Sequence, residues 1–455
     1  MDVIAEQVVK YAEVILQRVW ADLDRGFEFK TISGDSLSVI YPGTWNLEEG
    51  PDFLNAEISV NGSLLTGDIE IHNTPADWYS HGHENDNLYA NVILHVVKNS
   101  PIKSTKIPKI QTVLLQDFTI YEFLKKNKNE EVNYPEGLCI SKFHDLSENS
   151  ICMYLGKVGV NRLNNKVLVY TSEILKNGVD NAFLKYFFKA CGYKKNKDHF
   201  IELYERISKY GIDKFDAESI AAVLWGESGF LPDPSLMKLD ESMHEFVKST
   251  WSKWWSIRKN SMDNKMIPWN LSAVRPLNSP HRRIAALSNL LISANSTPFL
   301  YYRSLFENEI NDREILLLMI KNLNCNDPLW IQYVNFYKKI NHPSNLIGKN
   351  RALEIIGNLI LPFIIAYAKI KNDSVLGKKV FDLWCSMPSG QINIIQKIAV
   401  NRWGLKDKKI SKVFKTFAAQ QGSIFLHKNM CEFRHMNCKI CPVIKNESAK
   451  RSWYE

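Results

Sequence analysis

A short acidic segment between residues 50 and 97 contains four of the eleven histidines of this chain. Aspartate, glutamate and apolar residues at strand-like spacing separate them. Imidazole nitrogen is a preferred ligand of transition metals, and carboxylate oxygen is a preferred ligand of Mg²⁺ and Mn²⁺. The segment therefore indicates a metal-binding or hydrolytic site. The four histidines are His72, His81, His83 and His95.

One candidate set combines two carboxylates with an imidazole. Glu70 and His72 are two residues apart in a predicted strand, so their side chains project from the same face. Asp52 begins the preceding strand, across a hairpin predicted at residues 61–62. An aspartate and a glutamate on neighbouring strands can bind Mg²⁺ or Mn²⁺, and His72 can orient or deprotonate a water molecule. Glu13, in a predicted leading helix, is a further candidate acid.

A second candidate set follows directly in the sequence. His81 and His83 are separated by one residue, Asp86 follows three residues later, and His95 lies in an apolar strand. Such a group can hold Zn²⁺ or Fe²⁺ in a metal-dependent hydrolase. Each of these histidines can equally be a surface residue or a hydrogen-bonded core residue.

Three cysteines near the C-terminus form a separate candidate site. Cys431, Cys438 and Cys441 have the spacing Cys-x6-Cys-x2-Cys, which is typical of ligands for zinc or an iron–sulfur cluster. The spacing resembles the iron–sulfur loop of helix-hairpin-helix DNA glycosylases, although Glu447 stands where the fourth cysteine would fall. The fourth ligand would have to be His427, His435 or Cys385. The alternative is a segment held by packing alone.

The charge is distributed unevenly along the chain. Residues 1–125 contain 9 Lys/Arg and 18 Asp/Glu, whereas the other 330 residues contain 48 and 31. This asymmetry indicates an acidic module joined to a basic region that meets a polyanion, or basic helices that are simply solvated. Tryptophan among basic residues can stack on bases and neutralise phosphates. The candidate nucleic-acid-binding residues are Trp254, Arg275, Arg282 and Arg283.

The spacing of apolar residues predicts an α+β fold. A helix is expected over residues 2–20, two hairpins over 27–41 and 56–72, a short helix over 75–80, and strands over 89–98 and 112–116. From about residue 146 onward nearly every segment has helical spacing. We therefore expect an acidic mixed-sheet α/β module over residues 1–125. A large, basic, all-helical domain over residues 140–455 follows and ends in the cysteine cluster, with a sub-boundary near residues 259–267.

No membrane partner is expected. The longest apolar run, residues 355–368, is interrupted by Gly357, Asn358 and Pro362, so it is interpreted as a buried helix. The first residues include Asp2, Glu6 and Glu13 in place of a basic and then purely apolar signal. These features predict a cytoplasmic protein.

Residues 1–100 resemble the core of the PD-(D/E)xK nucleases. That core has an α-β-β-β-α-β order, with Pro-Asp before one strand and an acid-x-Lys motif on the next. Pro51-Asp52 and Glu70-Ile71-His72 fill these positions. The resemblance implies a restriction-nuclease-like fold for the module. His72 replaces the lysine; an imidazole can act as a base near neutral pH, but it lacks a permanent positive charge.

Over its whole length the chain resembles the uncharacterised bacterial family DUF2851. The segments that carry this resemblance are Gly50-Pro51-Asp52-Phe53-x2-Ala56, Gly67-Asp68-Ile69-Glu70-Ile71-His72, Asp77-Trp78-Tyr79-x-His81-x-His83-x2-Asp86, Val92-Ile93-Leu94-His95-Val96-Val97, Arg275-Pro276-x-Asn278-x-Pro280, Gln420-Gln421-Gly422 and the three C-terminal cysteines. The resemblance implies no activity, because none is established for the family.

Three functional hypotheses follow from the sequence. The leading one is a Mg²⁺- or Mn²⁺-dependent phosphodiesterase acting on nucleic acid through Asp52, Glu70 and His72, with Glu13 as an outer acid. The second is a transition-metal hydrolase of a small molecule that uses His81, His83 and Asp86. The third is a non-catalytic scaffold or nucleic-acid-binding protein, in which the polar cluster is a structural hydrogen-bond network.

Overall fold

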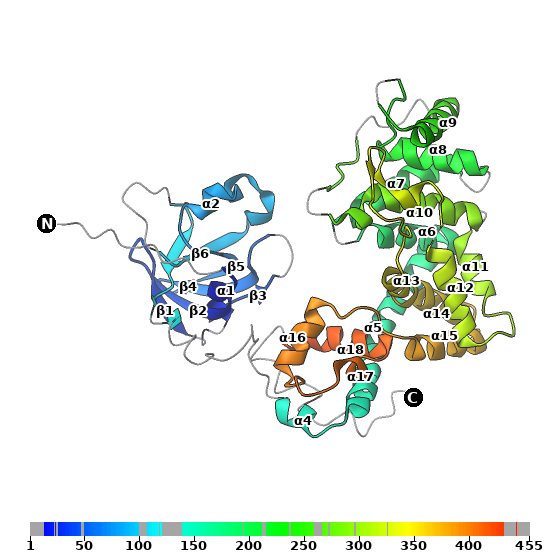
Figure 1. The fold of residues 1–455 in the computed structure, drawn as a ribbon. Coiled ribbons are helices and arrows are strands. Elements are labelled where there is room, and N and C mark those ends of the chain that lie inside the picture. The colour runs from blue at the N-terminus through cyan, green and yellow to red at the C-terminus, as the bar shows by residue number, and fades with distance from the viewer. Residues whose placement is uncertain are drawn as a thin grey trace. The chain divides into compact units, whose positions relative to one another are not determined.

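The computed structural model of this chain contains two compact units, which are described separately (Figure 1). One unit comprises residues 1–146, 394–408 and 426–455, and the other comprises residues 147–393 and 409–425. The structure describes residues 13–21, 23, 26–46, 50–99, 107–117, 119–120, 139–193, 195–211, 215–235, 238–258, 266–271, 274–294, 297–324, 326–431 and 443.

The first unit is built on a mixed sheet with the strand order β1-β2-β4-β5-β6-β7, and β3 pairs with β4. Neighbouring strands are antiparallel from β1 to β5, whereas β5, β6 and β7 are parallel. The predicted mixed sheet and both predicted hairpins are confirmed. The elements are α1 (Glu13–Ala21), β1 (Phe27–Lys30), β2 (Ser36–Tyr41), β3 (Thr44–Trp45), β4 (Phe53–Val60), β5 (Ser63–His72), α2 (Asp77–Ser80), β6 (Val92–Val97), β7 (Gln111–Leu114), α4 (Ile140–His144), α16 (Ile394–Arg402) and the π-helical turn η8 (His427–Cys431).

The connection between β5 and β6 positions the candidate site. Parallel neighbours cannot be joined by a tight turn, so residues 73–91 form a crossover that contains α2 and the short 3-10 turns η1 (His83–Asn85) and η2 (Asn87–Tyr89). In the second half of β5 both faces are buried. Ile69 and Ile71 join the hydrophobic core, so Glu70 and His72 project from the opposite face and are buried there.

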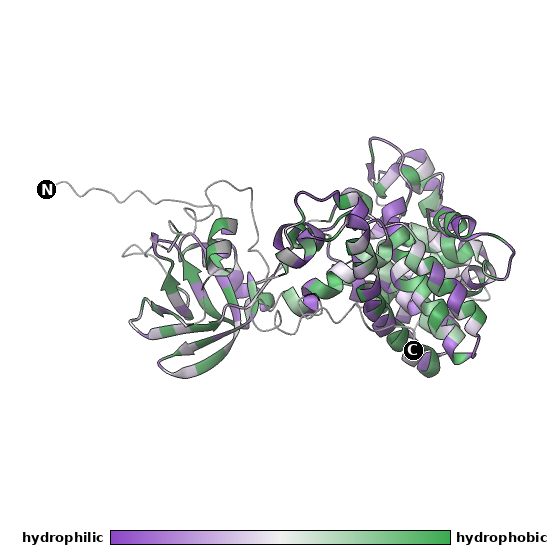
Figure 2. Cartoon of the chain, turned by 90° about the horizontal axis from the view of Figure 1, so that it is seen from below, coloured by the Kyte–Doolittle hydropathy of each residue, from purple (hydrophilic) through white to green (hydrophobic). Residues whose placement is uncertain are grey.

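The second unit is mostly helical, and hydrophobic and hydrophilic residues alternate around its helices (Figure 2). Its large hydrophobic core draws on nearly all of these helices. The unit also contains a short hairpin of β8 (Tyr333–Asn335) and β9 (Lys338–Lys339), so it is not entirely helical. The helices are α5 (Glu148–Asn177), α6 (Val179–Cys191), α7 (Lys197–Ile207), α8 (Ala217–Ser228), α9 (Glu241–Ile257), α10 (Pro280–Ser293), α11 (Pro298–Ser304), α12 (Asp312–Asn324), α13 (Lys349–Ile355), α14 (Leu361–Ile370), α15 (Ser374–Ser386), α17 (Ile410–Val413) and α18 (Phe417–Leu426), with 3-10 turns η3 (Ser208–Tyr210), η5 (Pro276–Asn278) and η6 (Trp330–Gln332).

The longest apolar segment lies inside this unit. Residues Lys349–Ile370 are long and apolar enough to cross a membrane, but 72% of their most apolar window is buried, as expected of a core helix. The segment passes through a π-helical turn, η7 (Ile356–Ile360), between α13 and α14. Pro362 has no N–H, so the carbonyl of Asn358 lacks its α-helical donor; the Tyr170 hydroxyl donates to that carbonyl at 2.9 Å.

Candidate metal centre

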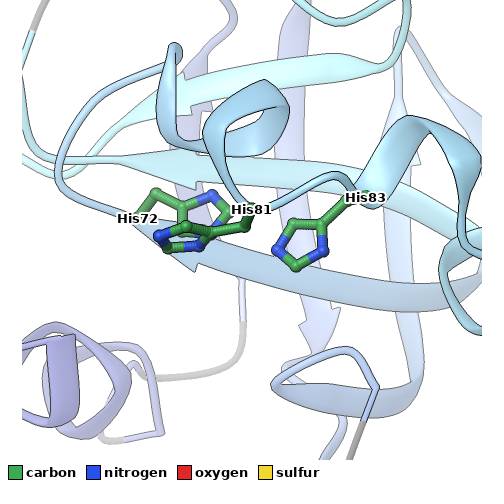
Figure 3. Close-up of side chains that lie close together, drawn as sticks. All are labelled: His72, His81 and His83. Carbon is green, nitrogen blue, oxygen red and sulfur yellow. The ribbon is translucent and has the colours of Figure 1, made fainter.

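Three histidines converge at the end of β5 (Figure 3). His72 is the last residue of β5, and its side chain is buried. His81 and His83 lie in the crossover that returns the chain to β6. One ring nitrogen of each of the three lies within 4.8 Å of those of the other two. The crossover therefore brings both histidines of the predicted His-x-His pair to the histidine of β5.

Glu70 completes this group. Its Oε1 atom lies 3.3 Å from Nε2 of His72 and 3.3 Å from Nε2 of His83. The Nε2 atom of His72 is also 3.1 Å from Nδ1 of His81. His83 Nε2 is buried and has no hydrogen bond of good geometry. Glu70 therefore adjoins two members of the three-histidine group, and His72 adjoins the third.

The three shortest distances in this group are compatible with the edges of a metal coordination shell. A ligand bond of about 2.1 Å gives neighbouring donor atoms about 3.0 Å apart in an octahedron and about 3.4 Å apart in a tetrahedron. The three distances, 3.1, 3.3 and 3.3 Å, lie in this interval. A carboxylate and three imidazoles form a donor set suited to Zn²⁺, Fe²⁺ or Mn²⁺.

Asp52 lies beside Glu70, and each of the two carboxyl groups accepts a backbone N–H from the other residue's segment. The backbone N–H of Asp52 donates to Oε2 of Glu70 at 3.0 Å, and the backbone N–H of Ile71 donates to Oδ2 of Asp52 at 3.0 Å. Gln17, on α1, donates from Nε2 to Oδ1 of Asp52 at 2.6 Å. The two carboxylates that the sequence paired are therefore neighbours, and α1 fixes the orientation of one of them.

The carboxyl groups of this site are crowded and buried. Burial raises the pKa of Glu70, and the charge of Asp52 raises it further. Burial also raises the pKa of Asp52, with hydrogen bonds from Ile71 and Gln17 acting in the opposite direction. The pKa of Glu13 is raised by burial as well, and its charge adds to the repulsion at both other carboxyls. A divalent cation would relieve this concentration of negative charge.

His72, His83 and His95 are held in the neutral form. Burial, and to a lesser extent the neighbouring imidazoles, lower the pKa of His72 to about 2. Burial is the main cause that lowers the pKa of His95 to about 4 and the pKa of His83. Neutral imidazole is the form that binds metals.

His95 lies behind His72 and fixes its ring. Nε2 of His95 is 2.9 Å from Nδ1 of His72, so one N–H lies between the two rings. When His72 provides that proton, its Nε2 atom presents a lone pair to the cluster. Metal-binding histidines commonly donate their other N–H in this way. His95 is fully buried on β6, beside β5, and is not one of the four donors.

Aromatic rings of the crossover cover the site on one side. Tyr89 stacks on His83 with ring centroids 3.8 Å apart. Trp78, on α2, contacts the rings of His83 and His95 at centroid distances of 5.4 and 5.6 Å. These rings restrict the orientation of His83 and reduce its exposure to water.

Asp86 does not belong to the cluster. Its exposed carboxylate accepts the backbone N–H of Leu88 at 2.9 Å and caps η2. The predicted set of His81, His83 and Asp86 is therefore corrected: its two histidines join Glu70 and His72, and the aspartate has a structural contact instead. The Asx-type spacing of residues 86 and 88 was the signal for this cap.

The predicted nucleic-acid contacts need a correction as well. Arg282 is fully buried, and its guanidinium donates to four backbone carbonyls, of Trp330, Tyr333, Ser344 and Asn345. Arg283 and Trp254 are also buried, so these three side chains cannot contact a nucleic acid in this structure. Arg275 is exposed and remains a candidate. The sequence pattern was misread because basic residues near tryptophan also occur as buried hydrogen-bond donors.

The C-terminal cysteine site stays a prediction. Cys431 ends η8 and is partly buried, whereas Cys438, Cys441 and His435 lie outside the described residues. The sub-boundary expected near residues 259–267 also falls mostly on residues that are not described.

Two parts of the site were not predicted from the sequence. Gln17 and the covering ring of Tyr89 come from segments with no metal-ligand spacing. Gln17 lies on α1, four residues after the predicted acid Glu13, and this one-turn spacing was the available signal that the two share a face.

The chain was compared with known protein families, curated proteins and solved structures. The model of the protein family of unknown function DUF2851 matches residues 13–392, and the chain belongs to this family. No curated protein and no solved structure matches the chain.

Proposed function

We propose that the first unit is a metal-dependent phosphodiesterase that acts on nucleic acid. One observation carries the proposal: the Oε1 atom of Glu70 lies 3.3 Å from the Nε2 atoms of both His72 and His83, and His81 adjoins His72 at 3.1 Å. These distances suit a shared cation, which Glu70, His72, His81 and His83 would hold. With three imidazoles, the site favours Mn²⁺, Zn²⁺ or Fe²⁺ over Mg²⁺.

Asp52 supplies the remaining chemistry in this proposal. A divalent ion bound to the four donors would polarise a phosphoryl oxygen and acidify a water molecule. Asp52 adjoins the donors, and its raised pKa suits a general base that accepts a proton near neutral pH. The hydrogen bonds from Gln17 and Ile71 hold its carboxylate in one orientation. His72 becomes a ligand in this assignment, because both its ring nitrogens face partners inside the cluster.

A phosphodiester substrate is supported by two further observations. Asp52 directly precedes β4, Glu70 lies on the adjacent strand β5, and a helix precedes this mixed sheet, a placement that the resemblance to PD-(D/E)xK nucleases implies. The charge of residues 126–455 is strongly positive, which suits a polyanionic substrate. A cation at the acidic site would also screen the phosphate from Glu13.

Cleavage assays test the proposal. Full-length protein is incubated with single- and double-stranded DNA and RNA, with Mn²⁺, Zn²⁺ or Mg²⁺ added after removal of metal. We expect cleavage with a transition metal and a loss of at least 100-fold in Glu70→Gln, whereas Glu57→Gln, at an exposed position of β4, retains full activity. Absence of cleavage of all polynucleotides, or an active Glu70→Gln variant, would reject the proposal.

The second candidate is a transition-metal hydrolase of a small molecule, which the three-imidazole donor set favours. It differs from the first in substrate, because the same four residues would hold the ion. Hydrolysis of a small phosphate diester or carboxylic ester, without cleavage of polynucleotides, would identify this alternative. An ion bound at full occupancy without any hydrolysis would indicate a structural site.

A further inference from the structure

The exposed face of α9 carries two aromatic and two basic side chains. Lys248, Trp251, Trp255 and Arg258 follow at intervals of three, four and three residues, so they share one face of the helix. Figure 1 shows α9 beside α8, at the outer edge of the helical unit. We call these four side chains the Trp251–Trp255 ledge.

The opposite face of α9 anchors the helix. Trp254 is buried against Gly226 of α8, where a Cβ atom would come within 2.2 Å of the indole ring. Met243 and Val247 are fully buried in the same core. Packing in the core therefore explains the presence of Trp254, but it does not explain why Trp251 and Trp255 are tryptophans.

The ledge is exposed at Lys248 and Trp255 and partly exposed at Trp251 and Arg258, and its side chains contact one another. Trp255 is 51% exposed. The rings of Trp251 and Trp255 lie 5.6 Å apart at 62°, and the guanidinium carbon of Arg258 lies 4.8 Å from the Trp255 ring centroid. An exposed indole can stack on a nucleic-acid base, and a nearby arginine adds positive charge to such a site.

The charges around the ledge are mostly positive. Lys248 is exposed, and Arg258 follows the last turn of α9. Lys253 lies on the flank and pairs with Asp216 at 3.2 Å, so it contributes little net charge. The two glutamates of α9, Glu241 and Glu245, are confined to the first five residues of the helix.

We propose that the Trp251–Trp255 ledge binds single-stranded nucleic acid. Unpaired bases stack on the indoles, and Lys248 and Arg258 contact the phosphates. A duplex hides the faces of its bases, so it cannot use the two indoles in the same way. Single-stranded nucleic acid as the substrate rests on the proposed function, but its binding to the ledge can be tested without cleavage.

Binding is measured by fluorescence anisotropy of a labelled 20-nucleotide oligo-dT and of a blunt duplex of equal length. Full-length protein is used with EDTA, so that no strand is cut. We expect tighter binding of the single strand, and binding roughly tenfold weaker or more in Trp255→Ala, the loss typical of one stacked base. Trp255→Phe keeps a stacking ring and should restore most of the affinity.

Matched variants separate stacking from folding and from charge. Tyr337, another exposed aromatic residue of this unit, serves as the control, and Tyr337→Ala should bind like the wild type. Arg258→Gln should lower the slope of log affinity against log salt concentration by about one. Circular dichroism and thermal melting of each variant confirm that the fold is retained.

Several results would overturn the inference. These are absence of single-strand binding, unchanged binding in the Trp251→Ala/Trp255→Ala double variant, and equal losses for the duplex and the single strand. The double variant could instead abolish self-association or binding to anionic vesicles while leaving oligo-dT binding unchanged. That result would assign the ledge to a protein or membrane contact. By contrast, a Glu70→Gln variant that no longer cleaves but still binds oligo-dT would support the ledge as a binding site separate from the metal centre.

Discussion

Replacing Glu70 with glutamine should raise the stability of the metal-free protein and reduce the stabilisation that a bound metal provides. In the metal-free protein, Glu70 is a buried carboxyl beside Asp52, and its pKa is raised. A raised pKa in the folded state means that the folded chain keeps a proton that the unfolded chain has released. Its contribution to stability is therefore present below the ordinary pKa of about 4.3 and is lost as pH rises through the raised value.

The amide of a glutamine avoids this loss because it carries no charge. Its oxygen can accept the N–H of Asp52, as Oε2 of Glu70 does, and its NH₂ can donate to the imidazole nitrogens that Oε1 now faces. We expect metal-free Glu70→Gln to be more stable than the wild type by about 1–3 kcal/mol at pH 8, the penalty of a poorly solvated polar group. For a unit of this size, the melting temperature would rise by roughly 2–10 °C.

With metal, the gain in stability of the variant should be largely offset. A ligand at 100 times its dissociation constant stabilises the wild type by about 2.7 kcal/mol. If the loss of one charged donor weakens binding 100-fold, the same concentration stabilises the variant by only about 0.4 kcal/mol. Calorimetric melting in EDTA and in excess Mn²⁺ or Zn²⁺, from pH 6 to pH 9, measures both effects.

The control is Glu57→Gln, which removes an exposed carboxylate from the neighbouring strand. It should shift neither the metal-free melting temperature nor the metal-induced increase. The reasoning is refuted if metal-free Glu70→Gln melts below the wild type at pH 8, or if the ion stabilises both proteins equally.

Three further predictions concern the site and the helical unit. His95→Phe, which removes the partner of His72 Nδ1, should weaken metal binding 10- to 100-fold by titration calorimetry, and unchanged affinity would contradict the assigned role. Metal affinity should increase from pH 6 to pH 8, because the raised pKa of Glu70 requires proton release on binding; an affinity independent of pH would argue against Glu70 as a ligand. Arg282→Met should destabilise the helical unit by about 3–5 kcal/mol in urea, since it removes the buried guanidinium that donates to four backbone carbonyls, and a stability loss below about 1 kcal/mol would contradict this.

Strand period explains why much of the site was predictable from the sequence. Glu70 and His72 lie two residues apart on β5, and the hairpin at residues 61–62 places Asp52 beside them. These relations depend on local backbone geometry, which sequence patterns reveal well. The merging of the two predicted sets was not predictable in this way, because it depends on the path of the crossover between β5 and β6.

The predictions for the helical unit were less successful at the level of single residues. Helical spacing predicted that this region is mostly helical. The pattern did not distinguish Trp254, which packs on Gly226, from the exposed Trp255 beside it, because the orientation of a helix is set by its neighbours. The buried Arg282 was misassigned for the same reason: its carbonyl partners come from residues 330–345, distant in sequence.

The metal content of the purified protein tests the central claim most directly. Plasma mass spectrometry of full-length protein, loaded with a mixture of Mn²⁺, Zn²⁺ and Fe²⁺ and dialysed, gives the number of ions per chain. Because the C-terminal cysteines can bind their own metal, the comparison uses the His81→Ala/His83→Ala variant and a control, His144→Ala, at an exposed position. We predict that the double variant holds one ion per chain fewer than the wild type and the control. Equal metal content in all three proteins would contradict the account.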